Sequence, residues 1–150
     1  MPIRCEIVSQ DRLVYEGDAD VIIVPGIEGE MGILPNHSPL LSTLKLGVLR
    51  VRSQGEEKDF TISGGVIEVQ PNLVTVLADS AENVMEIDVA RAEAAKIRAE
   101  ELLAQGPGPD TDSYLSLEAA LRRSNLRLEA VRRFRGQRAP SSGKGQEDSS

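Results

Sequence analysis

Apolar and polar residues alternate along much of the first half of the chain, as they do in half-buried β-strands. Turn residues such as Pro25-Gly26 and Pro71-Asn72 separate the alternating stretches. Strands at this spacing, with no helix-period segment between them, predict a sandwich or barrel of antiparallel neighbours. The segments with alternating or β-branched patterns are 3–8, 19–24, 47–52, 59–62, 66–69 and 73–77.

The pattern changes near Asp88, where a helix-forming segment begins. From there to Gln105 the residues are mostly Ala, Glu, Lys and Arg, without Gly or Pro. Such residues favour a helix, and Asp88 is a suitable N-cap. The Gly-Pro-Gly-Pro run at 106–109 ends it.

A second helix is predicted from near Ser116 to about Phe134. Its apolar residues recur at helical spacing and form one face. The short connection predicts an antiparallel helical hairpin. The residues of that face are Leu117, Leu121, Leu128 and Val131.

These patterns divide the chain into a β domain at 1–86, a helical hairpin at 87–135 and a tail at 136–150. The tail is poor in apolar residues, so we expect it to be disordered. The first helix offers mostly Ala to its partner. Burial contributes only about 25 cal/mol per Å² of apolar surface, so such a thin seam holds the helices weakly. We expect that the helices can separate or swing out.

Composition narrows the classes of protein that the chain can be. Only 3% of residues are aromatic and Trp is absent, so the core must be aliphatic. No apolar run is long enough to cross a membrane, and no secretion leader is visible, so we expect synthesis in a cytosol-like compartment. Cys5 falls in step with apolar neighbours and is interpreted as a core residue. The net charge is −8 over 1–86, −3 over 87–115 and +4 over 116–150, which suggests an anionic partner for the basic end.

The residues that enzymes use are sparse. The single histidine, His37, stands between prolines in a predicted turn, without a spaced nucleophile or carboxylate. Acidic pairs such as Glu56-Glu57 and Glu100-Glu101 fit solvated faces. No metal-ligand spacing, dinucleotide fingerprint or phosphate loop occurs, and the basic helix lacks the interleaved aromatics of a nucleic-acid binder.

Four segments in order resemble one family, the epsilon subunit of rotary F-type proton-translocating ATP synthases. The resemblance extends from about residue 3 to 135. Its segments are Val24-Pro25-Gly26-Ile27-Glu28-Gly29-Glu30-Met31-Gly32-Ile33-Leu34-Pro35-Asn36-His37-Ser38-Pro39-Leu40-Leu41, Gly47-Val48-Leu49-Arg50-Val51, Ser63-Gly64-Gly65-Val66-Ile67-Glu68-Val69 and Val74-Thr75-Val76-Leu77-Ala78-Asp79.

The resemblance implies a ten-stranded β-sandwich followed by an antiparallel two-helix hairpin. It also implies a non-catalytic central-stalk subunit that couples proton transport to ATP synthesis. The sandwich would dock on the gamma subunit and on polar loops of the c-ring, with Glu30 and His37 in the loops that face them. The complex would lie on the cytoplasmic face of a bacterial plasma membrane, or on the stromal face of a thylakoid, with only indirect membrane contact.

In the family the hairpin regulates: folded down it permits turnover, and extended along gamma it blocks ATP hydrolysis. Arginines of the second helix would then meet acidic surfaces of the catalytic beta (and alpha) subunits. Without the resemblance we would interpret them as a solvated helix face. These arginines are Arg122, Arg123, Arg127, Arg132, Arg133 and Arg135.

Some family members also bind ATP on the folded hairpin, so the resemblance offers an alternative function as an ATP-sensing module. No cofactor is required, and ATP would be a regulatory ligand. The same residues also suit helix capping and pairing alone. The positions that match the family's ATP site are Glu82, Ile87, Asp88, Arg91, Ala92, Arg98, Arg123 and Arg127.

Overall fold

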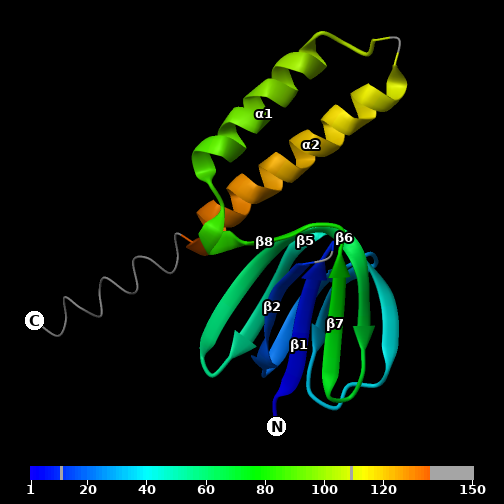
Figure 1. Ribbon diagram of the computed structural model, residues 1–150, viewed down its shortest axis with the longest axis vertical. Coiled ribbons are helices and arrows are strands. Elements are labelled where there is room, and N and C mark those ends of the chain that lie inside the picture. The colour runs from blue at the N-terminus through cyan, green and yellow to red at the C-terminus, as the bar shows by residue number, and fades with distance from the viewer. Residues whose placement is uncertain (11, 109, 136–150) are drawn as a thin grey trace, which may run out of the picture. The chain divides into compact units, whose positions relative to one another are not determined.

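The computed structural model describes residues 1–10, 12–108 and 110–135. Contacts between residues group the chain into two compact units, Met1–Val84 and Met85–Ser150. Figure 1 shows strands in the first unit and two long helices in the second. The predicted tail at 136–150 lies outside the described residues.

The first unit is a β-sandwich of eight described strands in one continuous hydrogen-bonded sheet, with the order β2-β1-β7-β6-β5-β3-β4 and β8 paired to β6. All pairs are antiparallel except β1 with β7. The strands are β1 (Ile3–Ser9), β2 (Arg12–Ala19), β3 (Val21–Gly26), β4 (Gly29–Ile33), β5 (Leu40–Ser53), β6 (Glu56–Val69), β7 (Leu73–Ala78) and β8 (Ala81–Asn83).

The predicted fold class is confirmed, but the strand number is eight and not ten. The difference comes from β5 and β6, which each run for 14 residues and pass from one layer to the other. The first half of β6 pairs with β8, and its second half pairs with β7. If the halves of β5 and β6 are counted separately, ten strand segments result.

Gly64 and Gly65 lie where β6 changes layers. The sequence predicts separate strands at 59–62 and 66–69, but both belong to β6. Buried positions shift from Phe60 and Ile62 to Ile67 and Val69, so the inward face changes from even to odd numbers. Both glycines have positive φ, at +118° and +134°. They therefore bend the strand without ending it.

The core lies between the two layers and is mostly aliphatic, as predicted. Cys5 is fully buried in it. The Tyr15 ring lies 5.4 Å from the Phe60 ring, centroid to centroid, at the edge of this core. The prediction missed β2, β4 and β8, because their residues are mostly exposed or half-buried and leave little alternation.

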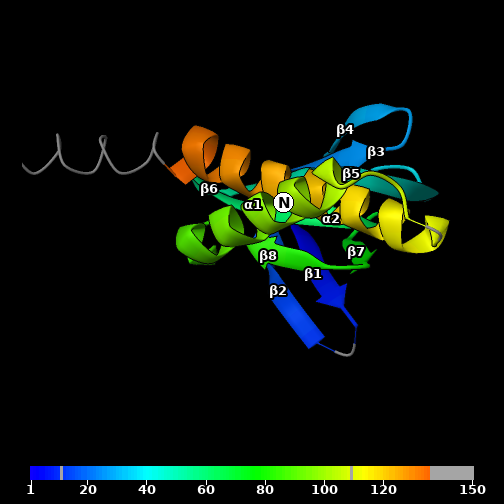
Figure 2. The same cartoon turned by 90° about the horizontal axis from the view of Figure 1, so that it is seen from above.

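The second unit contains α1 (Val89–Ala104) and α2 (Thr111–Ala130), which ends in the π-helical turn η2 (Val131–Arg135). A 3-10 turn, η1 (Val84–Glu86), precedes α1. Figures 1 and 2 both show α1 and α2 side by side and antiparallel. Asp88 caps α1 as predicted, accepting a hydrogen bond from the Arg91 backbone N–H.

The predicted start of the second helix, near Ser116, is wrong, because α2 begins at Thr111. Asp110 caps it: its carboxylate accepts hydrogen bonds from the backbone N–H groups of Asp112 and Ser113 and from the Ser113 hydroxyl. This cap satisfies N–H groups that would otherwise lack partners in the first turn. Apolar periodicity does not reveal this start, because the first turn of α2 is polar.

Small residues form the buried positions of the two long helices. Ala92 and Ala99 are buried on α1, and Ser124 and Ala130 are buried on α2, whereas the larger Ile87 and Phe134 are buried just before α1 and just after α2. The predicted leucine face of α2 is only half-buried, and Ile97 and Leu102 of α1 are exposed. Little apolar area is therefore buried along this seam.

Candidate functional site

The two loop residues expected to meet partners lie at different ends of β4. Glu30 is exposed beside the β3–β4 turn, and its carboxylate lies 3.6 Å from the Arg50 guanidinium. His37 is half-buried in the loop after β4, where its Nδ1 lies 2.7 Å from the Ser38 carbonyl oxygen. The same loop is fixed by a hydrogen bond from the Asn36 N–H to the Pro71 carbonyl. The structure does not bring Glu30 and His37 together.

The outer face of the sheet formed by β2, β1, β7, β6 and β5 carries an apolar row. Strand register aligns Leu13, Val8, Leu77, Val66 and Thr43 across these five strands. Leu13 is 53% exposed, Leu77 54% and Val66 38%. We call these four apolar residues, with Thr43 at their end, the apolar row.

A shallow hollow of about 540 Å³ opens beside the apolar row. Val8 and Leu77 line it together with residues at the end of β7. Its other lining residues are Gln10, Ala78 and Asp79.

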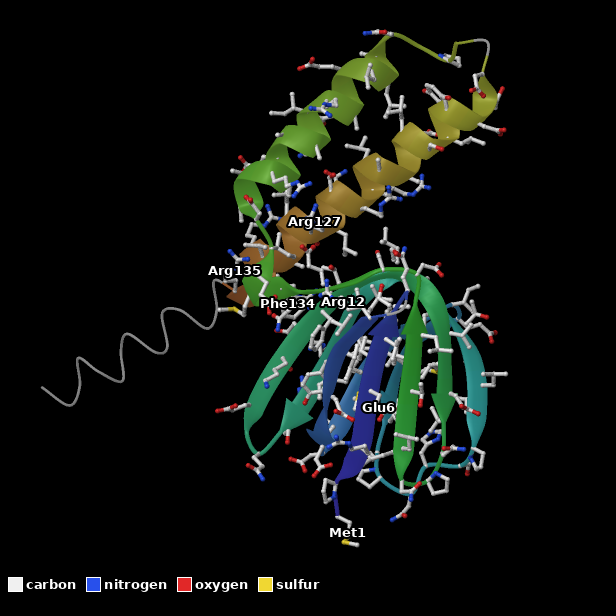
Figure 3. All side chains as sticks on the ribbon, viewed as in Figure 1. Met1, Glu6, Arg12, Arg127, Phe134 and Arg135 are labelled. Atoms are coloured by element: carbon white, nitrogen blue, oxygen red, sulfur yellow. The ribbon has the colours of Figure 1, made fainter. Side chains whose placement is uncertain are left out.

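An acidic row runs beside the apolar row, two residues along β1, β7 and β6 and three along β2, where the register shifts. It contains Glu16, Glu6 and Glu68, which register aligns through Thr75 of β7. Figure 3 labels Glu6 on β1. Glu16 lies 3.0 Å from the Arg4 guanidinium, whereas Glu68 is exposed. The face therefore joins exposed apolar area to negative charge.

Sequence reasoning missed the apolar row, although a signal for it exists. Neighbouring residues of a strand point to opposite faces, so two apolar residues in succession place one of them outside. Such pairs occur at Ile7-Val8, Val66-Ile67 and Val76-Leu77. In each pair one residue is buried and the other belongs to the apolar row.

The residues that match the family's ATP site are divided between the two units. Glu82 lies on β8 of the first unit, where its carbonyl accepts a 3.5 Å hydrogen bond from Thr61. Ile87 and Ala92 are buried, and Asp88 is occupied as the N-cap of α1. The remaining positions are the arginines at 91, 98, 123 and 127.

Helix geometry places these four arginines on one side of the hairpin. Arg91 and Arg98 each precede a buried alanine of α1 by one residue, and Arg123 precedes the buried Ser124 of α2 by one residue. Antiparallel helices are related by an approximate two-fold axis perpendicular to the hairpin plane. Residues that come one position before a buried seam residue therefore lie on the same side of that plane in both helices. Arg127, one turn after Arg123, continues this basic side and is half-buried.

The other predicted arginines lie toward the end of the chain. Arg122, Arg132 and Arg133 are exposed, and the Arg133 guanidinium lies 5.1 Å from the Phe134 ring centroid. Arg135 is half-buried and donates a 2.8 Å hydrogen bond to the Ile87 carbonyl. Of the predicted partner-contact arginines, Arg135 is thus engaged within the hairpin.

Neither a metal cluster nor a membrane helix is found in the described part of the chain. No three His, Cys, Asp or Glu residues among 1–10, 12–108 and 110–135 are grouped to hold a metal ion. No described helix is long and apolar enough to span a bilayer. Burial raises the pKa of the Cys5 thiol to about 12, so it stays protonated in the fold at neutral pH.

Comparison with known families covers both units. The beta-sandwich domain of the family described as "ATP synthase, Delta/Epsilon chain" matches residues 2–84, and its long alpha-helix domain matches residues 85–132. The chain belongs to the ATP synthase delta/epsilon chain family. The matched ranges meet at the same point as the two compact units.

Relatives in this family are similar over most of the chain. An ATP synthase epsilon chain of Pelotomaculum thermopropionicum is 50% identical over 68% of this chain and 76% of its own length. One from Dehalococcoides mccartyi is 44% identical over 89% of this chain and 94% of its own length. These relatives confirm the resemblance to the epsilon subunit of F-type ATP synthase.

Solved structures agree with this assignment. A chain in the OSCP/F1/c-ring structure of the Euglena gracilis mitochondrial ATP synthase has a TM-score of 0.71 and 28% identity, over 86% of this chain and 80% of that one. A chain in the central stalk/c-ring structure from Tetrahymena thermophila has a TM-score of 0.60, and at 15% identity it shows the fold alone. The chain is thus an epsilon-type member of the ATP synthase delta/epsilon chain family.

Proposed function

We propose that the chain is a non-catalytic rotor subunit that docks through its β domain and regulates ATP hydrolysis through its hairpin. The apolar row with its hollow and flanking acidic row carries the docking part of the proposal. Exposed apolar area beside charged residues is typical of a protein-binding surface. Its occupant is the gamma subunit, and the β3–β4 turn with Glu30 meets polar loops of the c-ring.

The docking proposal is tested by co-purification of the chain with gamma. Leu77→Arg places a charge in the centre of the apolar row, and we expect it to weaken binding at least tenfold, because a buried unpaired charge costs several kcal/mol. Ile97→Arg is the matched control, since Ile97 lies on α1 and is 53% exposed compared with 54% for Leu77. Equal gamma binding by the two variants would reject this docking face.

The regulatory part of the proposal rests on the small-residue seam of the hairpin. Ala92, Ala99 and Ser124 bury little area, so this stretch of the seam adds little to the free energy needed to separate α1 from α2. We propose that the extended hairpin places Arg122, Arg132 and Arg133 against acidic surfaces of the beta and alpha subunits, and that it blocks hydrolysis there. Rim charges of this kind set specificity more than affinity.

Truncation tests this regulation in the assembled complex. A chain that ends after Ile87 retains the sandwich and lacks the hairpin, so we expect hydrolysis to rise while gamma still binds. Unchanged hydrolysis would remove the inhibitory role and leave the docking role intact. We place the complex on the cytoplasmic face of a bacterial membrane, or on the stromal face of a thylakoid.

A second function, ATP sensing, is favoured by the basic side of the hairpin. Guanidinium groups from two facing helices can clamp a phosphate chain with charge-assisted hydrogen bonds. Isothermal titration of the intact chain with ATP tests this function, with Arg98→Ala expected to weaken binding and Arg132→Ala to leave it unchanged. Absence of heat at millimolar ATP would reject ATP sensing.

A further inference from the structure

The end of the hairpin opposite the connecting loop is held by a contact between Arg135 and Ile87, which lie 48 positions apart in the sequence. At one end of the hairpin the chain itself joins α1 to α2 through the 105–110 connection. At the other end, the Arg135 Nη2 atom donates a 2.8 Å hydrogen bond to the Ile87 carbonyl oxygen. Ile87 comes directly before the Asp88 N-cap, so its carbonyl lies at the entry to α1.

The π-helical turn η2 brings Arg135 to this position. An α-helix that widens into a π turn rotates all later residues relative to the preceding helix. In η2, Phe134 is buried and Arg135 is half-buried, whereas Arg132 and Arg133 remain exposed.

The physical properties of the contact suit a reversible attachment of the end of α2 to the start of α1. The Ile87 side chain is 3% exposed, so breaking the bond leaves a carbonyl with poor access to water. A hydrogen bond from a charged donor is stronger than a neutral one. The bond acts together with apolar packing at the same end of the hairpin, where Ile87, Ala130 and Phe134 are buried.

We propose that Arg135 and the Ile87 carbonyl form a latch that holds the free end of α2 against the start of α1. The latch itself does not depend on what the hairpin regulates. Its role in setting the resting state of the hairpin rests on the proposed regulatory function. Opening it would release the last turns of α2, with their exposed arginines, for a partner.

Hydrogen exchange of the intact chain tests the latch. Arg135→Ala removes the donor, and Arg132→Ala removes an exposed arginine from the same turn with the same change in charge. We expect amides in 93–98 and 126–135 to exchange about tenfold faster in Arg135→Ala than in Arg132→Ala. Amides of the β domain report whether each variant is folded.

Equal exchange in the two variants would overturn the latch. Loss of hairpin helicity in Arg135→Ala alone, with a protected β domain, would support it. In the assembled complex we expect Arg135→Ala to lower ATP hydrolysis relative to Arg132→Ala, because the unlatched hairpin extends more readily. Faster exchange with unchanged hydrolysis would keep the latch and reject the regulatory role.

Discussion

Replacing Gly65 by alanine should destabilise the β-sandwich through two separable effects. The first is backbone strain, since Gly65 has φ +134°, which side chains with a Cβ rarely adopt. The second is steric, because a Cβ would overlap the Leu77 carbonyl oxygen and lie 2.8 Å from the Ala78 Cα. Both atoms belong to the backbone of β7, so relief requires β6 and β7 to separate.

Gly29 supplies the matched control. Its φ is +137°, almost the same as at Gly65, but a Cβ there would meet nothing within 4 Å. Gly29→Ala therefore measures backbone strain alone, for which we expect a loss of about 1–3 kcal/mol. Gly65→Ala should lose about 1–3 kcal/mol more from the overlap with β7.

Urea unfolding of the two variants, followed by circular dichroism, measures the difference in the free energy of unfolding. The steric effect alone is a substantial part of the roughly 5–15 kcal/mol that stabilises a typical domain. In thermal unfolding each kcal/mol should lower the midpoint by about 4–8 °C in a domain of this size. Equal losses for the two variants would refute the steric argument at Gly65.

Three further predictions concern other parts of the chain. The Cys5 thiol should resist Ellman's reagent in the folded protein and react in urea. Its pKa is raised from 9.0 to about 12, so the stability it contributes is present below pH 9 and is lost as pH rises toward 12. Hydrogen bonds from Ser113 lower the pKa of Asp110, so its contribution to α2 is present above the ordinary value of 3.8 and is lost as pH falls through the lowered pKa. Asp110→Asn should keep the cap, and the protection of amides 111–116, measured relative to the intrinsic exchange rate at each pH, should fall less with acid in this variant than in the unchanged protein. Ala99→Leu should destabilise the hairpin by about 1–3 kcal/mol through overpacking, whereas Ala94→Leu on the exposed side of α1 should not, as thermal circular dichroism at 222 nm would show.

The sequence alone determined features that depend on local chemistry. Alternation found β1 and β7, because their inward residues are consistently apolar. Asp88 marked the start of α1, because an N-cap acts on the backbone N–H groups of the next turn. The ordered series of motifs identified the family, because many positions of the chain match the family's pattern in the same order.

The tertiary structure decided features that depend on contacts between distant residues. In the sequence, Gly64 and Gly65 resemble a turn between two strands. Residues 56–69 form the single strand β6 because β5 pairs along one side of it and β8 and β7 pair along the other. The apolar row exists because register aligns single exposed residues from five strands. The bond from Arg135 to Ile87 joins two positions that have no local relation, and it forms only when α2 folds back along α1 and ends in a π turn. Sequence patterns extend over a few residues, whereas these features are set by which segments meet in space.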